Sequence, residues 1–331
     1  MVKTQNIIER KNSDRQQENR LSSLLKGSGL KTFARLGNIL LKEGKIPAAI
    51  SSYYRGLKQV TNKADRGWEK KNCVEAEFII DRKYNFIYCP IAKVASSSMK
   101  RMAIELSDLK NKTEILKLPK ESIHAYVSHT LTLAANYSYL EAMEILEDSK
   151  YFKFVIVRNP WERLASAYLN KFVWNRDFQK PDLTPKYIKK VIQDVYNKQG
   201  LEPNYQRSIT FREFVDYLCD TEDSKLNGHW CPQYLYLGKM KYDLIGKVEN
   251  LSQDFEYIKT KLNLEIDLPW TNKTQKKQEH HDRNYSDYRP LQLSELERLP
   301  GDRQLYTPDL IELVAQKYRQ DIEMFDYNFA D

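Results

Sequence analysis

Glycine is missing from the most informative part of this 331-residue chain. The sequence contains 11 glycines, but none lies between Gly67 and Gly200. A phosphate-binding loop of the nucleoside-triphosphate type needs the pattern Gly-x-x-x-x-Gly-Lys-Ser/Thr, because glycine allows the backbone to wrap around the phosphates. This stretch cannot carry that pattern, and the sequence therefore disfavours phosphoryl transfer from ATP.

Long apolar runs and paired cysteines are also missing. No run reaches the roughly 18 apolar residues that a membrane-spanning helix requires. Residues 1–20 are polar and charged and lack the apolar centre of a signal peptide. The 4 cysteines include no Cys-x-x-Cys pair, and unpaired thiols are typical of a reducing compartment. We therefore expect a cytoplasmic protein without a membrane span.

Positive charge is in moderate excess. The chain has 53 lysines and arginines against 45 aspartates and glutamates, a net charge of +8. Such an excess suits nucleic acid, an acidic polysaccharide or a phosphate-bearing cofactor. No nucleic-acid-binding module is recognisable, so nucleic acid is not an expected partner. His280 and His281 are adjacent in a polar stretch and form no metal-ligand pattern, so no metal is expected.

The first quarter of the chain predicts a separate helical unit. Residues 1–28 are predicted to form a charged helical lead-in, and residues 63–76 a linker. Between them, residues 29–62 resemble one tetratricopeptide repeat, a helix–turn–helix unit. The matching positions are Phe33, Leu36, Gly37, Leu40, Gly44, Ala49, Tyr53, Gly56 and Leu57. Because one repeat does not bury its own apolar face, we expect a hairpin that packs on the main domain, on a second copy of the chain or on a protein partner.

From about residue 77 onward, short apolar strands alternate with amphipathic helices, which predicts an α/β domain over residues 77–331. The predicted strands are Phe78–Ile80, Phe86–Cys89, Phe154–Val157 and Tyr242–Gly246. The predicted helices are Met99–Leu106, Trp161–Phe172, Tyr187–Asn197, Phe211–Leu218, Ser252–Leu262 and Pro308–Phe325.

Two segments of this domain run from a strand through a polar loop into a helix. In the first, Lys93 and Val94 precede a helix start built from small and polar residues, namely Ala95, Ser96, Ser97 and Ser98. In the second, Arg158 follows the strand directly, and Ser166 comes two helical turns later. The N–H groups and the dipole at a helix start attract anions. Two such segments predict a ligand with two separated anionic groups.

These segments resemble the 5′-phosphosulfate loop and the 3′-phosphate loop of sulfotransferases that use PAPS (3′-phosphoadenosine 5′-phosphosulfate). The likeness is to carbohydrate sulfotransferases of the chondroitin, dermatan and HNK-1 type and their heparan 2-O relatives. It is strongest at Lys93–Ser98 and Val157–Phe172, and Ala92 departs from it where the family usually has proline. Further matching segments are 211–215, 229–233, 242–251 and 318–327. The resemblance covers roughly residues 77 to 328 and implies a P-loop-NTPase-like, three-layer fold with a central parallel sheet.

The resemblance also implies a chemistry, the transfer of a sulfuryl group from PAPS to a carbohydrate hydroxyl. Lys93 and the residues through Ser98 would bind the 5′ end of PAPS, and Arg158 and Ser166 its 3′-phosphate. The base that activates the hydroxyl would be one of three histidines, His124, His129 or His229. The Golgi members of the family carry a membrane anchor that we do not find in this sequence, which favours a cytosolic relative.

Several alternatives stay open at this level. For the whole chain, one alternative is an inactive PAPS-binding scaffold, and another is an enzyme that sulfates a peptide tyrosine or a small metabolite. For single residues, the alternatives are that Lys93 is an ordinary surface lysine and that Arg158 forms a structural ion pair with Glu162 on the next helical turn. Each histidine has an equally simple reading as a hydrogen-bonded structural residue.

Overall fold

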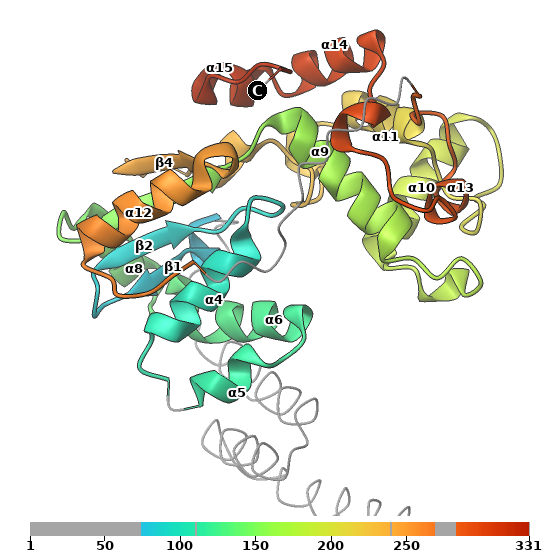
Figure 1. Ribbon diagram of the computed structural model, residues 1–331. Helices are drawn as coiled ribbons and strands as arrows, with labels where there is room; N and C mark the ends of the chain where they lie inside the picture. Colours follow the sequence, from blue (N-terminus) through green and yellow to red (C-terminus); the bar gives the residue numbers. More distant parts are fainter. Residues whose placement is uncertain (1–73, 110, 239, 269–282, 331) are drawn as a thin grey trace, which may run out of the picture.

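The computed structural model describes residues 74–109, 111–238, 240–268 and 283–330. The lead-in at 1–28 and the tetratricopeptide-like hairpin at 29–62 lie outside these residues, so both stay predictions. The first described element is a short 3-10 helix, η2 (Val74–Glu77), at the end of the predicted linker. The α/β class predicted for the remainder is confirmed (Figure 1).

The centre of the domain is a four-stranded sheet with the order β1-β2-β3-β4. The strands are β1 (Ile79–Asp81), β2 (Phe86–Cys89), β3 (Phe152–Val157) and β4 (Leu244–Lys247). Strands β2, β3 and β4 are parallel, but β1 runs antiparallel to β2. The predicted parallel sheet is confirmed for β2, β3 and β4, and the antiparallel strand β1 makes the sheet mixed.

The hairpin between β1 and β2 explains this difference. A parallel pair needs a crossover of about a dozen residues or more, and residues 82–85 are too few. Asn85 adopts a left-handed conformation with φ 53°. The Oδ1 atom of Asp81 accepts a hydrogen bond from the Tyr84 N–H at 2.8 Å. Together these features close a tight turn.

Helices form both crossovers and the C-terminal part of the domain. Between β2 and β3 lie α4 (Ser96–Leu106), α5 (Lys112–Leu116), α6 (Lys120–Thr130), α7 (Leu133–Asn136) and α8 (Tyr139–Glu147). Between β3 and β4 lie α9 (Pro160–Tyr168), η3 (Leu169–Trp174), η4 (Pro181–Leu183), α10 (Lys186–Lys198), α11 (Phe211–Asp220), η5 (Asp223–Lys225) and η6 (Gln233–Tyr236). After β4 come η7 (Val248–Asn250), α12 (Leu251–Leu262), α13 (Pro290–Ser294), η8 (Asp302–Leu305), α14 (Pro308–Lys317) and α15 (Arg319–Phe325).

Two predicted helices differ from those observed. The helix predicted over 161–172 changes after Tyr168 into a π-helix, η3. The helix predicted over 308–325 is two helices, because Tyr318 leaves the helical conformation at φ −106° and ψ 25°. The Tyr318 side chain is buried, and its hydroxyl donates to the Trp230 carbonyl. A tertiary contact therefore accompanies a break that the apolar stripe did not reveal.

The apolar side chains form two clusters. One surrounds the sheet, with β2 and β3 at its centre and α4, α6 and α12 contributing. The other is helical and combines α9, η3, α10, α11 and α14. Figure 1 shows α9 leaving the sheet and running into the helical part. The segments that follow β2 and β3 lie where the two clusters meet.

Candidate functional site

The two predicted anion-binding loops leave the same edge of the sheet. Strands β2 and β3 are parallel neighbours, with Cys89 opposite Val155. Loops at the carboxyl ends of parallel strands lie together, and ligands of open α/β sheets bind there. A direct contact confirms the proximity, because Arg163 Nε on α9 donates to Ala92 O at 3.0 Å.

The loop after β2 holds non-glycine residues in the left-handed region. Lys93 has φ 71° and Ala95 has φ 60°. This conformation costs roughly 1–2 kcal/mol for each residue with a Cβ. Ala95 is the N-cap of α4 and provides no side-chain cap. The N–H groups of Ser96 and Ser97, in the first turn, have no intrahelical acceptor. The loop thus presents backbone donors to an anion without using glycine.

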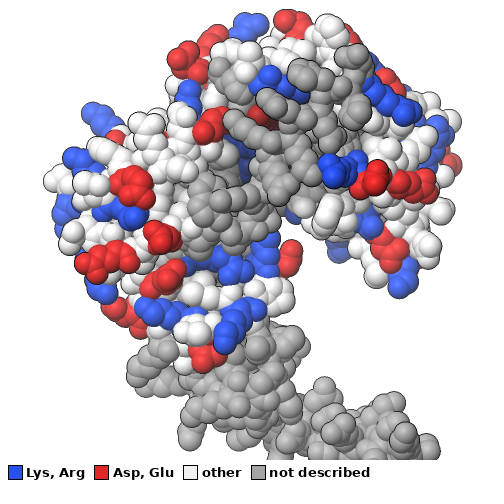
Figure 2. Space-filling model, viewed as in Figure 1, with Lys and Arg blue, Asp and Glu red and all other residues white. Residues whose placement is uncertain are grey.

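Lys93 is half-buried and lies near other cations. Burial is the main cause that lowers its pKa from 10.5 to about 7, and the charges of Lys120, Arg158 and Lys171 lower it further. These cations come from α6, the end of β3 and η3. Figure 2 shows Lys and Arg side chains along the hollow between the two parts of the molecule. The half-buried position of Lys93 among other cations disfavours the alternative of an ordinary surface lysine, and the cluster favours an anionic ligand.

Arg158 is held between two carboxylates. Its Nη2 lies 3.1 Å from Glu162 Oε2 and 2.8 Å from Asp302 Oδ2. Its Nε donates to Glu162 at 3.3 Å, so the ion pair that the sequence left open is present. Among the described residues, Nη1 has no hydrogen-bond partner. Burial raises the pKa of Asp302, and the charge of Arg158 opposes that rise. One side of the guanidinium is thus fixed while Nη1 is available to an anion.

The start of α9 differs from the start of α4, because its N–H groups already have an acceptor. Asn159 Oδ1 accepts from the N–H of Trp161 at 3.1 Å and of Glu162 at 3.4 Å. Pro160 has no N–H. An anion near the second loop would therefore meet side chains such as Arg158 instead of free backbone N–H groups. Ser166 lies on the half-exposed side of α9, whereas Trp161 is buried.

Segments far apart in the sequence hold the turn at Arg158 and Asn159. Gln233 accepts from Arg158 N–H at 2.9 Å and donates to Arg158 O at 2.8 Å. Glu249 accepts from Asn159 N–H at 2.8 Å and from the Tyr327 hydroxyl at 3.0 Å. These residues belong to the resembling segments 229–233, 242–251 and 318–327. These three segments therefore act together to fix the backbone of the second loop at Arg158 and Asn159.

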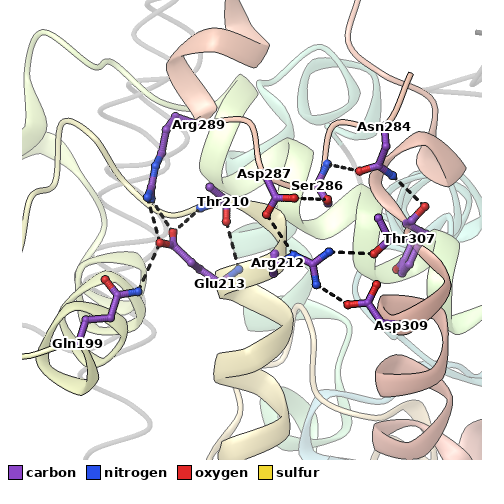
Figure 3. Close-up of polar contacts among 11 residues, drawn as sticks. Gln199, Thr210, Arg212, Glu213, Asn284, Ser286, Asp287, Arg289, Thr307 and Asp309 are labelled. Atoms are coloured by element: carbon purple, nitrogen blue, oxygen red, sulfur yellow. Dashed lines mark hydrogen bonds and ion pairs between the residues drawn. The ribbon is translucent and has the colours of Figure 1, made fainter. Parts of the chain in front are cut away.

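A polar network anchors the chain that leads toward Asp302 (Figure 3). Glu213 on α11 binds Arg289 through both carboxylate oxygens, at 2.5 and 3.0 Å. Arg212 donates to Asp287 at 3.1 Å and to Thr307 at 3.0 Å, and it also pairs with Asp309. Arg212 and Glu213, both in the segment 211–215, therefore fix residues on both sides of η8, the short helix that carries Asp302.

His229 has the features of a neutral base. Asn227 Oδ1 accepts the backbone N–H of His229 at 3.0 Å and lies 2.7 Å from Nδ1. Because an amide oxygen is an acceptor, Nδ1 carries the proton and Nε2 keeps its lone pair. The ring stacks on Tyr187 with 5.6 Å between centroids. Burial, followed by the charges of Lys171 and Lys93, lowers the pKa of His229 to about 3.

The other two histidines have different surroundings. His124 Nε2 lies 2.9 Å from Ser97 Oγ, so α6 brings a candidate base to the first loop. Burial and nearby lysines lower the pKa of His124 to about 4. His129 sits in the last turn of α6, where burial lowers its pKa and the charge of Glu77 opposes that shift. The structure thus brings His124 and His229 to the cation cluster, but not His129.

Three charged residues of the site were missed by sequence reasoning. Lys171 lies within the resembling stretch 157–172, so the motif itself signalled it, but no role was assigned. Lys120 begins α6 in a region where no helix was predicted. Asp302 reaches Arg158 from 144 residues away, and no local pattern marks it.

Taken together, a half-buried lysine, an arginine held by two carboxylates and a helix start without a side-chain cap lie at the carboxyl edge of an α/β sheet, an arrangement that suits a ligand with separated anionic groups. Residues 76–328 match the model of the Sulfotransferase family, and the chain belongs to this family.

Curated relatives are carbohydrate sulfotransferases. Carbohydrate sulfotransferase 11 of Rattus norvegicus is 33% identical over 189 residues, which cover 54% of this chain and 51% of that protein. Carbohydrate sulfotransferase 14 of Mus musculus is 31% identical over 179 residues, or 53% and 44%. Carbohydrate sulfotransferase 10 of Xenopus laevis is 29% identical over 207 residues, or 57% and 55%. The chain thus spans about half the length of the relatives it matches. No solved structure matches the chain significantly.

The relatives correct the expectation of a cytoplasmic protein. Carbohydrate sulfotransferases of this group are of the Golgi membrane type, and a cytoplasmic assignment conflicts with that kinship. Within the described residues, no helix is both long and apolar enough to span a membrane. Within the same residues, no three His, Cys, Asp or Glu side chains are grouped as ligands of a metal ion.

Proposed function

We propose that this chain transfers a sulfuryl group from PAPS to a hydroxyl of a carbohydrate, in a three-layer domain of the P-loop-NTPase-like kind. The observation that carries the proposal is the setting of Lys93, a half-buried lysine in a strained loop near three further cations. A partly buried cluster of like charges is costly unless an anion joins it. Membership of the sulfotransferase family supports the choice of anion.

The two loops suit the two ends of the co-substrate. PAPS supplies the sulfuryl group from its 5′-phosphosulfate and carries a separate 3′-phosphate. Lys93, with the hydroxyl and N–H groups of Val94 through Ser98, binds the 5′-phosphate and stabilises the charge that develops on the leaving oxygen. Arg158 and Ser166 bind the 3′-phosphate, for which a guanidinium is well shaped.

A histidine accepts the proton of the acceptor hydroxyl. The hydroxyl oxygen forms its bond to sulfur while the bond from sulfur to the bridging oxygen breaks, and the proton passes to the imidazole. His229 fits this role because its Nδ1–H faces Asn227 Oδ1, which leaves the Nε2 lone pair to accept the proton. Burial and neighbouring cations lower the pKa of His229 in the free protein, and the negative charge of bound PAPS acts in the opposite direction because it stabilises the protonated ring. His124 is the second candidate, although its Nε2 is already bonded to Ser97.

Substitution distinguishes the three histidines. We expect His229→Ala to lower kcat by about 10²–10⁴-fold, the usual contribution of a general base. His124→Ala should have a smaller effect, through the loss of its bond to Ser97. His129→Ala should leave kcat within about threefold, because a base acts only within hydrogen-bond reach of the reacting proton. A large loss in His129→Ala alone would contradict the assignment.

The transfer itself is tested with radiolabelled PAPS and a panel of unsulfated glycans, beside a tyrosine peptide and small hydroxylated metabolites. We expect label in a glycan, with inhibition by PAP (the desulfated product) and not by ATP. Label in the peptide or metabolite alone would replace the carbohydrate as acceptor. Calorimetric binding of PAP without transfer to any acceptor would instead support an inactive scaffold.

A further inference from the structure

Arg163 is a charged side chain in the interior of the protein, with 1% of its surface exposed. It projects from α9 and donates to three backbone carbonyls. Nε bonds to Ala92 O at 3.0 Å, Nη1 to Cys231 O at 2.8 Å, and Nη2 to Gly228 O at 3.4 Å. Within the described residues, its hydrogen bonds include none to a carboxylate.

These carbonyls flank two residues of the candidate site. Ala92 directly precedes Lys93, and Gly228 directly precedes His229. One planar guanidinium therefore joins the backbone beside the leaving-group lysine to the backbone beside the candidate base. The hydroxyls of Tyr236 and Tyr318 also donate to this second segment, at Gly228 O and Trp230 O. Neither of these bonds reaches the loop after β2.

Stability alone does not account for a charge at this position. Removing a guanidinium from water is costly, and apolar side chains of similar volume often replace buried charges without loss of stability. What an apolar residue does not provide is a fork of donors with fixed directions. The charge is therefore best explained by the relative position that it imposes on the two segments.

We propose that Arg163 is a positioning residue that holds the Lys93 loop and the His229 segment in one fixed register for sulfuryl transfer. The inference rests on the proposed function. An in-line displacement needs the leaving group and the attacking hydroxyl on opposite sides of sulfur, so the spacing of Lys93 and His229 matters. A misplacement of about 1 Å costs roughly 100-fold in rate. The same helix also carries Ser166, so one element sets the register of all three groups.

Two variants and one control test this role. Arg163→Lys keeps the charge but loses the fork, and Arg163→Gln loses both. We expect each to lower kcat by about 100-fold, while the Kd for PAP changes less than threefold. Tyr318→Phe removes a hydrogen bond to the same 228–231 segment but does not affect the Lys93 loop. It should keep kcat within threefold.

A measurement on the ligand-free protein separates geometry from charge. Lys171, Lys93, Arg163 and His124 are the groups whose charges, together with burial, lower the pKa of His229. In a histidine titration followed by NMR, Arg163→Gln should raise the pKa of His229, whereas Arg163→Lys should keep it low. A low kcat in Arg163→Lys with an unchanged histidine pKa identifies position as the cause.

The outcomes divide clearly. Near wild-type kcat in Arg163→Lys overturns the inference alone, and so does an equal loss of kcat in Tyr318→Phe. If neither Arg163 variant folds, as judged by thermal unfolding, Arg163 serves stability and the inference also falls. If the wild-type protein neither binds PAP nor transfers label, the proposed function itself is overturned, and the inference about Arg163 falls with it.

Discussion

The loops after β2 and β3 leave the same edge of the sheet, but they prepare for an anion in different ways. The first is strained at Lys93 and Ala95, and the helix behind it has no side-chain cap. In the second loop, the polar groups already have partners within the protein. Asn159 caps α9, and Glu162 and Asp302 form ion pairs with Arg158. Helix starts of similar sequence pattern therefore differ in what they offer a ligand.

This contrast fits two different tasks. A group that must stabilise a developing charge gains from a desolvated setting, where electrostatic interactions are strong. A group that fixes one end of a ligand gains from a rigid side chain with a defined direction. We therefore expect damage to the first loop to affect kcat, and damage to the second to affect binding.

The largest expected effect is that of Lys93→Ala. Loss of the ammonium should lower kcat by about 10³-fold, the upper range for one donor to a developing oxyanion. The Kd for PAP should change much less, because Arg158 and the backbone donors remain. Alanine keeps the Cβ, so the left-handed backbone cost is unchanged. Lys190→Ala, at an exposed ion pair with Asp194, is the control. Near wild-type turnover in Lys93→Ala would remove the first loop from the chemistry.

Substitution of Arg158 should have the opposite effect, a large loss of PAP affinity with little change in kcat. Arg158→Ala should weaken PAP binding by about 10–100-fold, since a hydrogen bond to a charged group contributes roughly 1.5–3 kcal/mol. Arg158→Lys should recover part of this loss, because the charge remains without the fork. At saturating PAPS, kcat should stay within a fewfold of wild type. Equal losses of kcat in Arg158→Ala and Lys93→Ala would mean that both loops act on one group.

The pH dependence of PAP binding should depend on the first loop. The pKa of Lys93 is about 7 in the free protein, and a bound anion favours the charged lysine, which raises that pKa. Binding above pH 7 therefore takes up a proton, so affinity is full below pH 7 and falls as the pH rises above it, by no more in total than the loss of affinity in Lys93→Ala. Calorimetry from about pH 6 to about pH 9, which covers both sides of the pKa of about 7 in the free protein, measures the slope. Lys93→Met should abolish the slope, and its persistence there would assign the proton to another group.

Sequence reasoning was most successful where the signal is local. The strand Phe86–Cys89 and the helix start near Ser96 could be predicted because apolar runs and small polar residues mark them directly. The direction of β1 was not predicted, although the short connection at 82–85 contained the necessary information. The helices α5 to α8 were missed. Helices α5 and α7 have only 5 and 4 residues, and the longer α6 buries only Ile123 and Val127, so its apolar stripe is sparse.

The partners of the site could not be predicted, because they come from distant segments. Nothing local indicates that Asp302 reaches Arg158 or that Gln233 holds its backbone. The sequence analysis did not single out Asn159, although Asn-Pro before a helix is a typical capping pattern, and this cap distinguishes the two loops. The pKa of Lys93 depends on cations from three other elements and required the fold.

The smallest expected effect tests the cap that makes the two loops different. Asn159→Ala removes the acceptor for two N–H groups of α9 and a donor to Asn328 O at 2.8 Å. The free energy of unfolding should fall by about 1–2 kcal/mol, measured by thermal unfolding against Asn197→Ala, an exposed residue of α10. The loss should be the same with and without PAP, because these N–H groups already have their acceptor and do not bind the ligand. A loss of PAP affinity with unchanged stability would instead make Asn159 a ligand-binding residue, and the second loop would then resemble the first.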